Sequence, residues 1–267
     1  MSNYFHTKTR KKHNKITMVA AVTIKSLILH LSAFLWCCYG AYHDQYTYYS
    51  PNFATYGGRF KYLTHCTAYL CHATYGFAFL VDLIHLLTGR NTSGDRNKDR
   101  SFLVSIRDYL VTMWSSNLSV FVVIMFWAVA YIDLEGIHPA EHQKIVPLFG
   151  WFNQYLHTIP GVITFILLTN VNYKHRSFLA SVVSAIAFGA FYFSWMKHLA
   201  DVMGTWPYSF IDGMPNNVFT GFVVVTHVVI LVIDLFNRWI SRIAWGSAGD
   251  DIGLPGMIHG KANKKRV

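Results

Sequence analysis

Six long apolar stretches constrain the fold of this 267-residue chain more than any other feature. About 20 mostly apolar residues let a helix cross the hydrocarbon core of a bilayer, where a helix can satisfy its own backbone hydrogen bonds. The sequence therefore predicts an all-α fold, a polytopic membrane helical bundle with six transmembrane helices. The six stretches run over residues 16–39, 62–88, 110–132, 151–170, 178–199 and 218–240.

Composition agrees with a membrane bundle. Only 13% of the residues are charged, whereas soluble domains usually carry about 25%. The apolar stretches take up most of the length, which leaves no room for a soluble catalytic domain. We expect one bundle over residues 16–240, with a basic N-terminal tail at 1–15 and a C-terminal tail at 241–267.

The positions of Lys and Arg predict the orientation. They gather in the N-terminal tail, in the loops after the second and fourth stretches and in the C-terminal region, whereas the opposite side carries Arg59, Lys61 and Lys144. Because basic loops stay in the cytosol, both termini should be cytoplasmic. The clusters between apolar stretches suit anionic lipid headgroups, so we expect no nucleic-acid partner, and the sequence indicates no protein partner.

The last four residues, Lys264 to Val267, bear on localisation. Two lysines near a cytoplasmic C-terminus resemble the dilysine retrieval signal of the endoplasmic reticulum. The alternative is a basic tail attracted to headgroups, which would also suit the plasma membrane.

The four cysteines lie in or beside apolar stretches and are expected to be buried thiols. They are Cys37, Cys38, Cys66 and Cys71, and a disulfide from Cys66 to Cys37 or Cys38 is the alternative.

Several ionisable residues fall within the apolar stretches, where they are costly and are functional candidates by default. Those near the ends of stretches are expected to reach the membrane interface. This group contains Asp82, His85, Lys197 and Asp234. Hydrogen-bonded structural roles are expected for the deeper ones: they are Lys25, His30, His72 and His227.

One hydroxyl and one imidazole are expected at similar depths in the membrane. Thr64 and His157 lie near the starts of two stretches that enter from the same side of the membrane, and their depths differ by about 5 Å. Asn153 precedes His157 by four residues and shares its helix face. A hydroxyl beside a neutral imidazole is the minimum for nucleophilic acyl transfer. However, a threonine within a helix often bonds its own backbone, and a histidine is often a satisfied core residue.

Five motifs in collinear order resemble one known family, that of the androgen-induced gene 1 protein and the androgen-dependent regulator of tissue factor pathway inhibitor. The resemblance covers about Thr55 to Phe210 and does not extend to the two tails. The motifs are the decapeptide TYGGRFKYLT at 55–64, SIRD at 105–108, the segment from Phe121 to Pro139 with Phe126 and Trp127, the segment from Trp151 to Thr158, and the loop with Gly204, Trp206, Tyr208 and Phe210.

The resemblance implies a function: a membrane-embedded carboxylic ester hydrolase for fatty acid esters of hydroxy fatty acids, with no cofactor. By this resemblance Thr64 is the nucleophile and His157 the base, in a threonine hydrolase. We expect Asn153 to orient the base or donate to the oxyanion. A basic side chain near the mouth would hold the lipid carboxylate, for which Lys61, Lys197 and Arg59 are the candidates. The alternatives are a non-enzymatic regulatory membrane protein and a haem- or ion-handling bundle.

Overall fold

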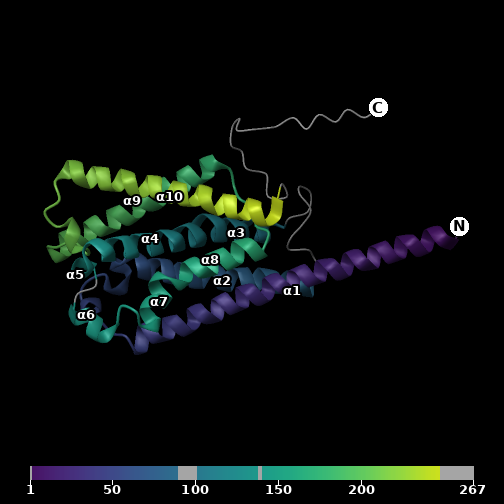
Figure 1. The fold of residues 1–267 in the computed structure, drawn as a ribbon, viewed down its shortest axis with the longest axis horizontal. Helices are drawn as coiled ribbons and strands as arrows, with labels where there is room; N and C mark the ends of the chain where they lie inside the picture. The colour runs from purple at the N-terminus through teal and green to yellow at the C-terminus, as the bar shows by residue number, and fades with distance from the viewer. Residues whose placement is uncertain (1, 90–100, 138–139, 247–267) are drawn as a thin grey trace.

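The computed structural model describes residues 2–89, 101–137 and 140–246, and every regular element within these ranges is helical. Five helical segments are long and apolar enough to cross a membrane. These segments lie side by side as a bundle (Figure 1). The predicted all-α membrane bundle is therefore confirmed. The five segments are Ile24–Tyr46, Leu63–Leu87, Phe102–Ile132, Phe178–Met203 and Asn216–Trp245.

Helices α1, Ser2–Tyr46, and α2, Leu63–Leu87, run antiparallel and contribute to a hydrophobic core that they share with α8 (Ile159–Asn170) and α10 (Asn216–Trp245). Small side chains such as Ala33 and Ala78 let α1 and α2 approach closely. α1 is longer than the predicted first span, and its N-terminal part projects beyond the other helices (Figure 1). Two short 3₁₀ helices, η1 at Pro51–Ala54 and η2 at Gly58–Lys61, lie in the connection between α1 and α2.

The third spanning segment combines α3, Phe102–Tyr109, a π-helical turn at Leu110–Ser115 and α4, Ser116–Ile132. The sequence predicted a start near residue 110 and counted Arg107 among the charges of a loop. The structure corrects this, because Arg107 lies inside the helix and is 1% exposed. The short helices α5, Leu134–Ile137, and α6, Ala140–Ile145, follow.

The predicted span at 151–170 is not one helix. It divides at Thr158 into α7, Trp151–His157, and α8, Ile159–Asn170. Pro160 explains the division, because proline has no N–H to offer the preceding turn. The remaining helices are α9, Phe178–Met203, and α10, Asn216–Trp245, joined by a loop that contains the 3₁₀ turn η4, Ser209–Ile211. Their outer faces expose large apolar side chains such as Phe191 and Val232, as lipid contact requires.

Three residues expected to reach the interface are buried instead. Asp82 and Asp234 are fully buried, and His85 is 3% exposed. Each has hydrogen-bonding partners inside the bundle, such as Arg107 for Asp82 and Arg238 for Asp234. Hydropathy along the sequence scores each charged residue separately. It therefore misses pairing, which lowers the cost of burying two charges together.

All four cysteines are free thiols, with Cys37 and Cys71 buried. The alternative of a disulfide from Cys66 is therefore not realised in this structure. Lys264 to Val267 lie outside the described residues, as does most of the C-terminal tail. The orientation in the membrane stays a prediction from the charges of the sequence.

Candidate active site

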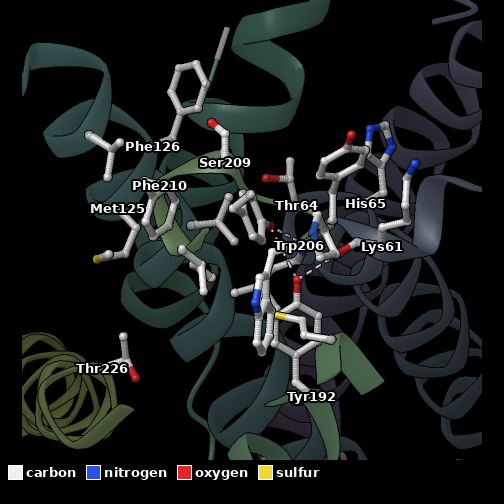
Figure 2. A pocket seen from close by; sticks show the side chains of 18 of the residues that line it. Lys61, Thr64, His65, Met125, Phe126, Tyr192, Trp206, Ser209, Phe210 and Thr226 are labelled. Carbon is white, nitrogen blue, oxygen red and sulfur yellow. Dashed lines mark hydrogen bonds between the residues drawn. The ribbon is translucent and has the colours of Figure 1, made fainter. Parts of the chain in front are cut away.

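A cavity of about 780 Å³ opens among the starts of α2 and α7, the end of α4, and helices α9 and α10. Its volume is within the range typical of small-molecule sites. Figure 2 shows Lys61, Thr64 and His65 on one side of it, with Met125, Phe126 and Phe210 across from them. Most of the lining is aromatic or aliphatic. One set of polar groups lies near α2 and α7, and others lie in the α9–α10 loop and on α10, such as Asp212 and His227.

Thr64 and His157 meet in this cavity. The Oγ1 atom of Thr64 lies 3.3 Å from Nε2 of His157, across 93 residues of sequence. Thr64 is half-buried and His157 is 8% exposed. This separation is slightly longer than a strong hydrogen bond, which is usual for catalytic pairs before substrate binds. The two residues that the sequence placed at one depth are therefore side by side.

Asn153 fixes the tautomer of His157. The Nδ2 group of Asn153 donates to the carbonyl of Leu148 at 2.7 Å, and a carbonyl can only accept. Its Oδ1 atom must therefore face Nδ1 of His157, 2.9 Å away, and accept a proton from it. With Nδ1 protonated, Nε2 of the neutral ring is an acceptor directed at the Thr64 hydroxyl. Asn153 thus orients the imidazole, and its amide N–H₂ is turned toward Leu148.

Helix α4 holds the end of α7 in place. Trp127 Nε1 donates to the His157 carbonyl at 3.0 Å and to the Thr158 hydroxyl at 3.1 Å. This bond satisfies a backbone carbonyl at the break between α7 and α8. Phe126 stacks on the His157 ring with the centroids 3.5 Å apart. These contacts were not indicated by the sequence, although Phe126 and Trp127 both lie in a motif of the family resemblance.

The start of α2 is anchored by the loop before α10. The Leu63 N–H, which has no acceptor within its helix, donates to the Tyr208 hydroxyl at 2.9 Å. The Tyr192 hydroxyl donates to the Lys61 carbonyl at 3.1 Å. Burial raises the pKa of Tyr208 to about 12, so its hydroxyl stays protonated at neutral pH. These two tyrosines fix the turn that carries Thr64.

Lys61 lines the same cavity, one turn before Thr64. Its ammonium group donates to the Asn52 carbonyl at 2.7 Å and to the Thr55 hydroxyl, both uncharged. Within the described residues it has no carboxylate partner, although it is only 4% exposed. Burial lowers the pKa of Lys61, because water no longer stabilises its charge. A buried ammonium without a counter-charge is suited to an anionic ligand.

The other basic candidates are not brought to the cavity. Lys197 is 63% exposed and pairs with Asp201, and it does not line the cavity. Arg59 is paired with Asp44 at 3.2 Å, beside the cavity rather than in its wall. No group of three or more His, Cys, Asp or Glu side chains in the described ranges is arranged to hold a metal ion.

Similarity to known proteins identifies the family of this chain. Residues 25–242 match the FAR-17a/AIG1-like protein family, and this chain belongs to that family of membrane proteins. The androgen-induced gene 1 protein of Homo sapiens is 29% identical over 164 residues, which cover 61% of this chain and 67% of that protein.

A second group of relatives matches a longer part of the chain. The androgen-dependent TFPI-regulating protein of Mus musculus is 27% identical over 194 residues, covering 72% of this chain and 79% of that protein. The Homo sapiens protein of the same name is 26% identical over 198 residues, covering 73% and 81%. No solved structure matches the chain.

Proposed function

We propose that this protein is a membrane-embedded hydrolase of lipid esters, with fatty acid esters of hydroxy fatty acids as the substrate class. The observation that carries the proposal is the row from Asn153 through His157 to Thr64, in which an oriented imidazole offers an acceptor nitrogen to a hydroxyl. An amide, an imidazole and a hydroxyl in line are the arrangement of a base-activated nucleophile.

Acylation would start from this row. The Thr64 oxygen attacks the ester carbonyl carbon while Nε2 of His157 takes the hydroxyl proton. The first-turn N–H groups of Thr64 and His65 have no carbonyl acceptor within α2 and carry the positive end of the helix dipole, so they are suited to the oxyanion. When the C–O bond breaks, His157 returns the proton to the departing alkoxide, which leaves as the hydroxy fatty acid.

Deacylation repeats these steps with water. His157 takes a proton from a water molecule, whose oxygen attacks the acyl–Thr64 carbonyl. Collapse of this second tetrahedral intermediate breaks the bond to Thr64 and returns the proton to its oxygen, releasing the fatty acid. A β-branched nucleophile is crowded but has a restricted χ1 angle, so we expect slow turnover from a well-positioned hydroxyl.

Lys61 would hold the free carboxylate of the substrate. Its ammonium lines the cavity one turn from the nucleophile and has uncharged partners. A carboxylate there would supply the missing counter-charge, and charge-assisted hydrogen bonds are about twice as strong as neutral ones. The apolar remainder of the wall is suited to the two hydrocarbon chains.

The test is ester cleavage by the full chain in membranes, with wild type, Thr64→Ala and His157→Ala at matched expression. The rate of ester cleavage by each variant should fall at least about 100-fold, toward the background rate of empty membranes. Thr67→Ala, a buried threonine one turn further along α2, is the matched control and should keep activity. Full cleavage by either variant would end the proposal.

A non-catalytic regulatory protein is the alternative. It is favoured by the names of relatives, which describe androgen response and TFPI regulation. A wild-type protein that cleaves no ester and shows no Thr64-dependent labelling by a fluorophosphonate would support that alternative.

A further inference from the structure

The wall of the cavity farthest from the polar row is formed by α10. Its lining residues there are Phe222, Thr226, His227 and Ile230. Figure 2 shows Thr226 well apart from Thr64, across the space bordered by Met125 and Phe210. The hydroxyl of Thr226 is already used as a donor, since it donates to the Val223 carbonyl at 2.8 Å. Its oxygen can still accept, but it stays close to its own helix backbone, whereas the His227 ring extends a second acceptor from this wall.

The tautomer of His227 follows from its own helix. Nδ1 lies 2.7 Å from the Val223 carbonyl, and because a carbonyl only accepts, Nδ1 must carry the proton. Nε2 of the neutral ring is then an acceptor, and it has no hydrogen-bond partner within residues 2–89, 101–137 and 140–246. An acceptor in an apolar wall at membrane depth is costly unless a donor reaches it.

Gly189 of α9 makes room for this nitrogen. A Cβ atom at residue 189 would lie 2.0 Å from Nε2 of His227, so any side chain there would displace the ring. Gly189 and His227 both line the cavity, and Phe193 lies beside the ring with the centroids 6.2 Å apart. The absence of a side chain at Gly189 lets the Nε2 edge of the ring pack close to α9, within the wall that both residues share.

We infer that His227, seated against Gly189, forms a second polar subsite that accepts a hydrogen bond from a free hydroxyl on a fatty chain, such as that of the hydroxy fatty acid released by hydrolysis, because the ester oxygen itself carries no proton. This inference rests on the proposed function, because it extends the lipid-binding cavity of the hydrolase to its far wall. A neutral acceptor selects a donor and gives nothing to a plain methylene chain. The subsite would therefore discriminate hydroxylated chains from unsubstituted ones of the same length.

The experiment measures binding rather than cleavage, so that it is independent of hydrolysis. Purified full-length Thr64→Ala protein in nanodiscs is loaded with a tritiated fatty acid. The competitors are octadecanoic acid and its hydroxy derivatives with the hydroxyl near the carboxyl, at mid-chain and near the methyl end. At least one hydroxy acid should compete about fivefold better than octadecanoic acid, the gain expected from one neutral hydrogen bond.

Two further variants test the residues that form the subsite. Adding His227→Phe, which keeps a ring but removes the acceptor, should abolish the preference. Gly189→Ala should abolish it with His227 intact, because the methyl group takes the place of Nε2. The matched control is His198→Phe, an exposed histidine of α9 outside the cavity wall, which should keep the preference.

Equal competition by every acid in the Thr64→Ala protein would overturn the inference, as would a preference that survives both His227→Phe and Gly189→Ala. Either result could occur with ester cleavage intact. Conversely, a protein that cleaves no ester but shows the His227-dependent preference would refute the hydrolase and retain the subsite.

Discussion

The two ends of α2 differ in how completely the polar side chains around them are paired. At its C-terminal end, Asp82 accepts from Arg107 and from Ser26 and is bonded to His30, all of them buried. At its N-terminal end, His65 contacts Asp44, but Lys61 of the preceding η2 has uncharged partners and Thr64 meets an imidazole at 3.3 Å. Thr64 and Asp82 are separated along the helix by about 27 Å.

The paired end is a closed network. Arg107 also binds Asp108, whose other oxygen accepts from the Lys174 N–H at 2.9 Å, and His30 is bonded to the Tyr173 hydroxyl. This network ties α1, α2 and α3 to the segment after α8. The cavity end keeps polar groups with unused capacity beside empty space. Satisfied buried groups stabilise and specify a fold, whereas polar groups held ready in a cavity are typical of binding and catalysis.

The largest expected effect is on stability at the paired end. Arg107→Met leaves Asp82 and Asp108 buried without their shared counter-charge, and removing one partner of a buried pair costs about 3–5 kcal/mol. The apparent melting temperature in detergent should fall by several degrees or the protein should fail to accumulate. Lys61→Met at the other end should leave the apparent melting temperature unchanged or raise it. Equal losses for the two variants would remove the contrast between the ends.

Next in size is an effect on rate at the cavity end. Asn153→Leu removes the acceptor that fixes the His157 tautomer, and loss of such an orienting contact costs about 10- to 100-fold. The loss should appear in kcat rather than KM. Asn153→Asp can still accept from Nδ1 but cannot donate to the Leu148 carbonyl, so it should recover only part of the rate. A loss confined to KM would mean that Asn153 binds substrate instead.

Sequence patterns located most of the bundle, because length and apolar composition alone decide which segments can cross a bilayer. They failed at the start of α3 and at Asp82, since a window cannot see that Arg107 and Asp82 are partners 25 residues apart. They also treated 151–170 as one span. Pro160 explains the break, but the sequence alone did not indicate that Trp127 of α4 donates to the His157 carbonyl at that point.

The site was predictable where it depended on depth. Thr64 and His157 lie near the starts of segments entering from one side, and Asn153 follows from helical spacing. The direction in which each side chain faces could not be predicted from the sequence. Lys197 lies at a suitable depth, but the rotation of α9 turns it outward toward Asp201. Rotation is set by packing between helices, which a single sequence does not encode in any local pattern.

A smaller effect is expected on substrate preference. Lys61→Met should raise KM about 10-fold for esters with a free carboxylate, the size of one charge-assisted hydrogen bond. The methyl ester of the same lipid lacks the negative charge, so its KM should not change. This pair of substrates separates charge recognition from a general disturbance of the cavity. A similar rise for both esters would show that Lys61 shapes the turn before Thr64 and does not bind the carboxylate.

The smallest effect is a pH dependence of that same preference. Burial lowers the pKa of Lys61, so its ammonium loses its proton at a lower pH than a solvent-exposed lysine. Preference for the carboxylate over the methyl ester should therefore decline as pH rises through the lowered pKa. In the window between that value and the unfolded pKa, the unfolded chain holds one more proton at this lysine, so the contribution of Lys61 to folding stability rises with pH. Lys61→Arg, which stays charged, should keep the preference constant across the window. A preference that declines equally in wild type and Lys61→Arg would assign the titration to another group.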